Sequence, residues 1–185
     1  SLHIARIGSQ TNPISLNEIL RKANDEQLTP AAQNKERVLF LGIDVQQDFM
    51  DNGALGVPGA HGDVERMTQF IYNNMDKITN IAVSIDTHTP HQIFHPCWWI
   101  DENGNNPAPY TPITLADLDS GKYRAVIYPR QSRDYVEHLE KDGKKTLCVW
   151  SYHCLQGTSG AAFENQFANM IYFHSVAKKA VTQRL

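Results

Sequence analysis

Long apolar runs are missing from this sequence. No stretch approaches the roughly 18 consecutive apolar residues that a membrane-spanning helix needs. The N-terminal SLHIARIGSQ also lacks the apolar segment of a secretory signal peptide. We therefore expect no membrane partner and a cytoplasmic location.

Cysteine is scarce, and clusters of positive charge are absent. The three cysteines, Cys97, Cys148 and Cys154, show no CxxC spacing, which favours neither a disulfide framework nor a zinc–thiolate site. The formal net charge is -3, and no run of Lys and Arg is long enough to follow a phosphate backbone. The composition therefore predicts a small-molecule partner and no nucleic-acid partner.

The chain has 185 residues, enough for one domain with a substantial core. Residues 1–36 are polar, apart from one amphipathic segment, SLNEILRKAN, that Ser15 can cap as a helix. We interpret residues 1–36 as an N-terminal extension that packs on the domain or on a partner. Residues 37–185 are then the main domain.

Strands and helices alternate in this domain. Arg37–Val45 is apolar almost throughout, as in a strand covered on both faces. DVERMTQFIYNNMDKI has helical spacing, and Ile78–Asp86 follows as the next strand, which requires parallel pairing. Further strands are predicted at KTLCVWS and at Ile171–Val176. The predicted fold class is α/β, a three-layer α/β/α arrangement around a mainly parallel, Rossmann-like sheet.

Residues 96–130 interrupt the alternation. The segment from Asp101 to Gln131 holds four of the nine prolines, with a short helix predicted at 115–118 and a short strand at 125–128. RDYVEHLEKDG then predicts a helix that Gly143 ends. Insertions this long are usually functional or form a lid.

One carboxylate and three imidazoles are concentrated in SIDTHTPHQIFHPCWW, residues 84–99. Asp86, His88, His91 and His95 fall within ten residues, directly after a predicted strand. In open parallel α/β sheets, ligands bind outside the carboxyl ends of the strands. The pattern therefore predicts a divalent metal site.

Reactive side chains follow four predicted strands: Asp44, Asp86, the Tyr152-His153-Cys154 corner, and Lys178. The carboxyl ends of parallel strands meet at one edge of a sheet. We therefore expect these residues to converge on one active site.

Four motifs at these positions resemble those of the isochorismatase-like cysteine hydrolases, specifically the nicotinamidase (pyrazinamidase) branch. They are DVQQDF, GALGVPGA, the Asp-x-His of residues 86–88, and HCLQGTSGA. The match covers about residues 38–178, with a gap at the insertion. The resemblance implies an amidohydrolase: a cysteine thiolate attacks the carboxamide of a small molecule, ammonia leaves, and water hydrolyses the thioester.

The resemblance also implies roles for individual residues. Asp44 and Lys178 match the acid and the lysine of an Asp-Lys-Cys triad, with Lys179 as the neighbouring alternative. Asp44 would take the thiol proton, and the lysine would lower the thiol pKa.

The implied metal ligands are Asp86, His88, His95 and His153. In nicotinamidases such a set holds the ion that positions the pyridine nitrogen of the substrate, here most simply Zn, with Fe or Mn as alternatives. His91 competes with His95, and we prefer His95 because His91 beside Pro90 could simply face solvent. The aromatic residues expected to wall the pocket are Phe49, Trp98, Trp99 and Trp150.

The nucleophilic cysteine of the family lies on a further strand-to-helix turn, and none of the three cysteines matches it. Cys154 corresponds to the residue beside the metal histidine, Cys148 lies inside a predicted strand, and Cys97 lies in a loop. We expect a C-terminally incomplete chain, inactive by itself, whose apolar sheet edge favours a homo-oligomer. The alternatives are a natural inactive relative, or Cys97 or Cys154 acting as the nucleophile.

Two other functions compete with a nicotinamidase-like one. The first is hydrolysis of another amide, ureido or isochorismate substrate within the same superfamily. The histidines argue against isochorismate, and the long insertion argues against a plain nicotinamidase. The second is a non-catalytic binding or assembly module that keeps the metal pocket.

Overall fold

The computed structural model describes residues 4–9 and 11–185, and the chain divides into two compact units. Unit 1 comprises Ser1–Asp86 and Gly157–Leu185, and unit 2 comprises Thr87–Gln156. The predicted insertion at 96–130 lies in unit 2. Among the residues that the structure describes, no helix has the length and apolar character to cross a bilayer.

A parallel sheet organises unit 1. It contains β1 (Leu39–Gly42), β2 (Asn80–Val83) and β7 (Gln183–Arg184) in the order β1-β2-β7, with Leu39 opposite Asn80. Helix α2 (Ala60–Asn73) connects β1 to β2, as the helical spacing predicted. The α/β class and the parallel central sheet are thus confirmed.

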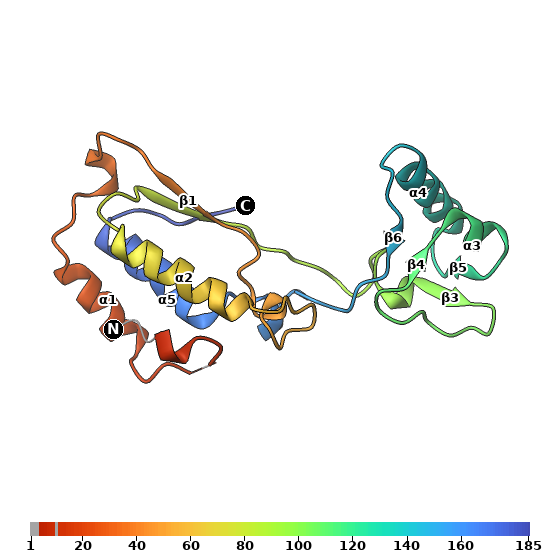
Figure 1. The fold of residues 1–185 in the computed structure, drawn as a ribbon, viewed down its shortest axis with the longest axis horizontal. Coiled ribbons are helices and arrows are strands. Elements are labelled where there is room, and N and C mark those ends of the chain that lie inside the picture. The colour runs from red at the N-terminus through yellow and green to blue at the C-terminus, as the bar shows by residue number, and fades with distance from the viewer. Residues whose placement is uncertain (1–3, 10) are drawn as a thin grey trace. The chain divides into compact units, whose positions relative to one another are not determined.

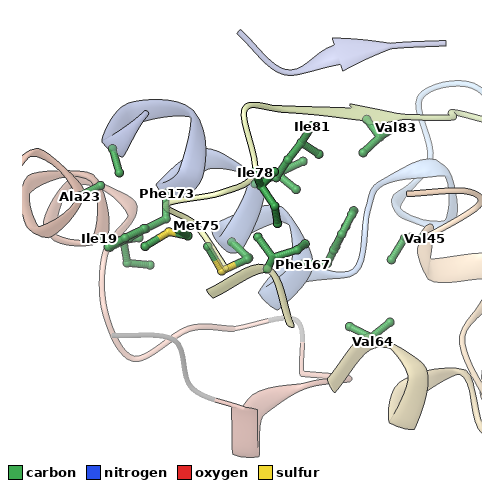
Figure 2. Packing of buried hydrophobic residues seen from close by; sticks show 14 of the residues in the cluster. Ile19, Ala23, Val45, Val64, Met75, Ile78, Ile81, Val83, Phe167 and Phe173 are labelled. Atoms are coloured by element: carbon green, nitrogen blue, oxygen red, sulfur yellow. The ribbon is translucent and has the colours of Figure 1, made fainter. Parts of the chain in front are cut away.

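Three helices supply the core beside this sheet. Figure 1 shows α2 and α5 (Asn165–Ala177) running along one face, and α1 (Leu16–Asp25) packs on α5. Figure 2 shows Ile19 and Phe173 from these helices in the same buried cluster as Ile81 of β2. Ser15 caps α1 as predicted, because its hydroxyl accepts the Glu18 N–H.

The opposite face of β1 is apolar and exposed. Leu39, Leu41 and Ile43 are 58%, 46% and 61% exposed, whereas Phe40 between them packs against the core. This alternation is the two-residue period of a strand. Within unit 1, the described helices therefore cover the Phe40 side of β1.

One strand prediction is wrong, and another predicted strand belongs to a different sheet. Ile171–Val176 forms the second half of α5, which buries Phe167, Ile171 and Phe173 along its length. A helix that is buried on most sides gives a continuous apolar run, and such a run cannot be told from a buried strand by its pattern. KTLCVWS contributes β6 (Leu147–Cys148), which belongs to unit 2 and pairs antiparallel rather than joining the parallel sheet.

Unit 2 is a small α+β assembly rather than an irregular loop. Strands β3 (Trp99–Asp101) and β5 (Tyr123–Ala125) pair antiparallel, as do β4 (Pro112–Ile113) and β6. Helices α3 (Leu115–Asp119) and α4 (Pro129–Lys141) complete it, and the predicted helix near 115–118 is confirmed. Its core consists of Trp99, Ile113, Ala125, Val136, Leu147 and Val149.

Short 3-10 turns account for much of the remaining regular structure. They are η1 (Ile4–Arg6), η2 (Ala31–Gln33), η3 (Gln47–Phe49), η4 (Pro96–Trp98) and η5 (Ser159–Ala161). Turns η3 and η4 follow the strands β1 and β2 and hold part of the candidate site.

His174 gives unit 1 a pH-dependent stability. Its ring is buried, its Nε2 donates to the Ile78 carbonyl at 3.0 Å, and burial lowers its pKa below the ordinary 6.5. As pH falls below the unfolded value, the unfolded chain takes up a proton that the folded ring resists, so stability falls by up to about 1.4 kcal/mol per pH unit.

We expect the His174→Gln variant, whose amide can still donate to Ile78, to lose that contribution. Between about pH 7.5 and about pH 5.5, urea unfolding should show a stability loss roughly 1 kcal/mol smaller than in the unchanged protein. An identical loss in both proteins would show that His174 does not carry the effect.

Candidate metal centre and carboxylate pocket

Asp44 follows β1 in an unusual backbone conformation. Its φ is 56°, in the left-handed region that Asp tolerates better than most residues. The Ser84 hydroxyl accepts the Asp44 N–H and donates to Asp44 Oδ1, each at 2.9 Å. Ser84 follows β2, so the ends of the two parallel strands are joined by side chains and the Asp44 carboxylate is held in one orientation.

A largely apolar pocket of about 650 Å³ lies beside Asp44 in unit 1. Its volume suits a small aromatic ligand. The predicted Phe49 lines it, together with Ile43, Val45, Met50, Leu55, Val57, Ala60, Asp63, Val64, Arg66 and Met67. Asp44 and Asp63 are the carboxylates of this lining, and the Asp63 carboxylate is paired with Arg66.

Three histidines meet in unit 2. The ring centroids of His88 and His153 lie 4.8 Å apart, and His95 lies 5.9 Å from His88 and 5.8 Å from His153. Phe94 packs edge-on against His88 and His95 at 5.0 and 4.8 Å. Three imidazoles at this spacing, beside an apolar ring, are the donor set of a borderline divalent metal.

Backbone carbonyls fix the tautomers of two of these rings. His95 Nδ1 lies 3.1 and 3.0 Å from the Thr89 and Pro90 carbonyls, and His153 Nδ1 lies 2.7 Å from that of Ser151. Carbonyls only accept, so both Nδ1 atoms carry a proton, and the lone pair of each ring in its neutral form is at Nε2. Such second contacts orient metal-binding histidines.

His95 is completely buried, and its Nε2 has no hydrogen-bond partner among the described residues. Burial lowers the pKa of His95, and the neighbouring His153 and His88 lower it further, although the two carbonyls oppose this. A buried lone pair without a partner costs free energy unless something binds it. This atom is therefore the clearest sign of a missing ligand in unit 2.

The Tyr152-His153-Cys154 corner is held to the His88 loop by backbone pairing. His88 N–H donates to the Cys154 carbonyl at 3.0 Å, and Gln156 N–H donates to the His88 carbonyl at 2.9 Å. Asp86, the last residue of unit 1, precedes His88 by two positions. Ligand atoms of Asp86, His88 and His153 lie within 4.8 Å of one another, whereas His95 is outside that group.

His91 lies apart from this cluster. It is exposed, and its ring centroid is 6.4 Å from that of Trp98. The two alternatives of the sequence therefore differ sharply in environment: His95 is enclosed beside His88 and His153, and His91 faces solvent.

Lys178 has partners at the amino end of the sheet. It is completely buried, and its Nζ donates to Asn34 Oδ1 at 3.0 Å and to the Asp76 carbonyl at 3.1 Å. Burial lowers its pKa. Asn34 precedes β1 and Asp76 precedes β2, whereas Asp44 follows β1, so Lys178 and Asp44 lie at opposite ends of the parallel strands.

The expected meeting of Lys178 with Asp44 is therefore wrong, because the strand predicted before Lys178 is part of α5. Lys179 lies at the same end of α5. At the carboxyl edge of the sheet, the third strand end is that of β7, where Leu185 exchanges backbone hydrogen bonds with Val83 and Ile85.

The tryptophans predicted to wall the pocket all lie in unit 2. Trp99 is completely buried, with its Nε1 donating to the Ile93 carbonyl at 2.6 Å, so it has no surface to offer a ligand. Trp98 Nε1 donates to Ser132 Oγ at 3.0 Å, and Trp150 is partly exposed against Tyr110.

The three thiols differ in exposure. Cys154 is completely buried, and Cys148 donates to the Val149 carbonyl while burial raises its pKa. Cys97 is partly exposed, and its thiol donates to the Pro90 carbonyl at 3.1 Å. A nucleophilic cysteine needs an accessible, easily ionised thiol, which excludes Cys154 in this conformation.

The supporting roles of three residues were not predicted from the sequence. Ser84 orients Asp44, and Phe94 packs on two histidines. Tyr152 accepts the Cys97 N–H at 3.1 Å, and its ring centroid lies 5.0 Å from that of His95, with the two rings tilted. Their positions beside predicted ligands in the sequence were the only signal that could have indicated these roles. Burial raises the pKa of Tyr152, so it remains a neutral hydroxyl beside His95.

No protein-family model and no curated protein matches the chain. Among solved structures, it is similar to a yeast nicotinamidase bound to the inhibitor nicotinaldehyde (18% identity, TM-score 0.49), covering 81% of this chain and 56% of that one. An Acinetobacter baumanii nicotinamidase and pyrazinamidase is 20% identical (TM-score 0.43), with 72% and 47% covered.

The pyrazinamidase of Pyrococcus horikoshii in complex with zinc is also similar (20% identity, TM-score 0.35), with 69% of this chain and 44% of that one covered. The chain thus spans about half the length of these nicotinamidases and pyrazinamidases.

Proposed function

We propose that this chain forms the metal-binding and substrate-binding part of a nicotinamidase-like amidohydrolase. The observation that carries the proposal is the buried Nε2 lone pair of His95, which has no partner among the described residues and lies beside the rings of His88 and His153. A metal ion would supply the missing partner.

The residues that would hold the ion are Asp86, His88, His95 and His153. Three imidazoles and one carboxylate suit Zn²⁺, with Fe²⁺ and Mn²⁺ as alternatives. When bound, the ion supplies a Lewis-acidic site for the ring nitrogen of a pyridine carboxamide. The Nδ1 contacts of His95 and His153 favour this role, since they leave both Nε2 atoms as donors of a lone pair.

Asp44 is proposed as the base. It would accept the proton of a cysteine thiol, the thiolate would add to the carboxamide carbon, and ammonia would leave with a proton returned to it. Water then hydrolyses the thioester to the carboxylate and restores the thiol. Ser84 holds the Asp44 carboxylate for this proton transfer.

Binding of nicotinamide, compared with benzamide, tests the proposal without requiring a nucleophile. The two amides have the same shape, but benzamide lacks the ring nitrogen. We expect the zinc-loaded chain to bind nicotinamide at least about tenfold more tightly than benzamide, a difference of about 1.4 kcal/mol. Chelation of the metal should abolish this preference.

Isothermal titration calorimetry measures the two affinities, and ammonia release is followed in the same samples. Equal affinities in the presence of zinc would contradict metal-assisted recognition of a pyridine. Selective binding without ammonia release would identify a binding module and would remove the hydrolytic part of the proposal.

A further inference from the structure

Gln46 is completely buried and uses its whole side-chain amide. Its Nε2 donates to the carbonyls of Asp86 and Ala161, both at 2.8 Å, and its Oε1 accepts the Asp86 N–H at 2.8 Å. All three residues belong to unit 1. An amide offers two donors and an acceptor, so these contacts satisfy both N–H groups and occupy the oxygen.

The two contacts with Asp86 extend the β1–β2 pairing beyond the end of the strands. Backbone pairing runs from Leu39 opposite Asn80 to Gly42 opposite Val83, and Ser84 N–H still donates to the Gly42 carbonyl at 2.9 Å. Farther on, the Gln46 side chain binds both the N–H and the C=O of Asp86, as a neighbouring strand would. Gln46 thereby fixes both the N–H and the C=O of Asp86.

Other side chains cannot make this set of contacts. Glutamate has no donor for the two carbonyls, and alanine leaves the Asp86 N–H and both carbonyls without their partner. The side chain at position 46 must therefore donate to two backbone carbonyls and accept one backbone N–H, each at 2.8 Å, and the amide of Gln46 does so.

We propose that Gln46 is a positioning residue, which fixes the Asp86 carboxylate so that it can bind a divalent cation. The inference rests on the metal-binding half of the proposed function. A carboxylate on a free segment must lose backbone entropy when it binds, whereas a carboxylate on a fixed backbone has already lost it. Contacts of this kind around a metal site typically contribute 10- to 100-fold, roughly, in affinity.

The test uses the full chain and zinc alone as the probe. Gln46→Glu keeps the size and one acceptor but loses both donors, and Gln46→Ala removes all three contacts. Gln166→Ala is the matched control, because Gln166 is also completely buried in unit 1, where its Oε1 binds Asn12. Zinc affinity is measured by competition with a chromophoric chelator, and stability by urea unfolding.

We expect zinc binding to weaken about 10- to 100-fold in both Gln46 variants and to stay within about twofold in Gln166→Ala. Amide exchange at Asp86 should accelerate in Gln46→Ala, because its N–H loses the acceptor. These two readouts separate positioning from a general loss of stability, which Gln166→Ala shares.

Unchanged zinc affinity in the Gln46 variants, with tight binding by the unchanged protein, would overturn the positioning role alone. Equal weakening in Gln166→Ala would overturn it as well, since burial alone would then explain the effect. Failure of the unchanged protein to bind zinc would instead overturn the metal-binding half of the proposed function.

Discussion

Replacement of His95 by glutamine should weaken zinc binding by at least about 100-fold, or about 2.7 kcal/mol. The substitution removes the imidazole lone pair at Nε2, together with the Nδ1 donor that the Thr89 and Pro90 carbonyls accept. His95 Nε2 is a buried atom that has no hydrogen-bond partner among the described residues. Competition with a chromophoric chelator measures the affinity, and circular dichroism verifies that the variant folds.

The exposed His91 is the matched control for this experiment. His91→Gln changes the same residue type in the same loop, on a ring that packs beside Trp98 and lies apart from the cluster. Its zinc affinity should stay within about twofold of that of the unchanged protein. The reverse result, with His91 required and His95 dispensable, would make His91 the ligand and leave the enclosed ring a structural one.

Glu164→Ala should lower the free energy of unfolding of unit 1 by about 2–3 kcal/mol. Glu164 is completely buried in front of α5, and its Oε2 accepts the Gln166 and Phe167 N–H groups at 2.7 and 2.8 Å. Its Oε1 accepts the Gly8 N–H at 3.0 Å, so it also holds the N-terminal segment. Alanine leaves all three donors without their acceptor.

Urea unfolding measures the change in the free energy of unfolding, and the Ser15→Ala variant is the reference with which it is compared. The Ser15 hydroxyl caps the exposed start of α1 with a single contact to the Glu18 N–H, and its removal should cost about 1 kcal/mol. Glu164→Gln retains acceptor oxygen and should fall between the two. If Glu164→Ala costs no more than Ser15→Ala, the buried carboxylate is an ordinary cap and does not secure the N-terminal segment.

Local patterns sufficed for the parts of the fold in which one signal dominates. The apolar runs before Asp44 and Asp86 became β1 and β2, and helical spacing between them became α2. Ser15 caps α1 because its hydroxyl can accept a backbone N–H group from the first turn of the amphipathic helix. Parallel pairing then followed from the strand–helix–strand order.

The remainder depended on tertiary contacts that a pattern does not contain. The apolar run at 171–176 is compatible with a strand, but burial of α5 between α1, α2 and the sheet makes it helical. The error displaced Lys178 to the wrong end of the sheet. Strand β7 was missed because its two residues are polar and exposed.

In the candidate site, too, some residues were predicted from local patterns and others depend on tertiary contacts. The loop at 86–95 was predicted as a metal site because its imidazoles and carboxylate follow a predicted strand, and His153 joined the ligand set through the family resemblance. Gln46 lies inside the quoted motif DVQQDF, and Ser84 begins the segment SIDTHTPHQIFHPCWW. No role was predicted for either residue, because amides and hydroxyls occur everywhere on protein chains. Their partners, the Asp86 backbone and the Asp44 carboxylate, are about 40 positions away in the sequence.

The pairing of His88 with Leu155 also bears on how the chain closes during folding. Unit 1 is assembled from two segments that unit 2, Thr87–Gln156, separates in the sequence. Because residues 88 and 155 pair within unit 2, folding of that unit shortens the effective loop between the two segments from about 70 residues to a few. Loop-closure entropy then costs about 2.5 kcal/mol less. A metal held by His88 and His153 would stabilise the same pairing of the segments around residues 88 and 155. Cation binding would then also favour the packing of β2 against α5 during folding.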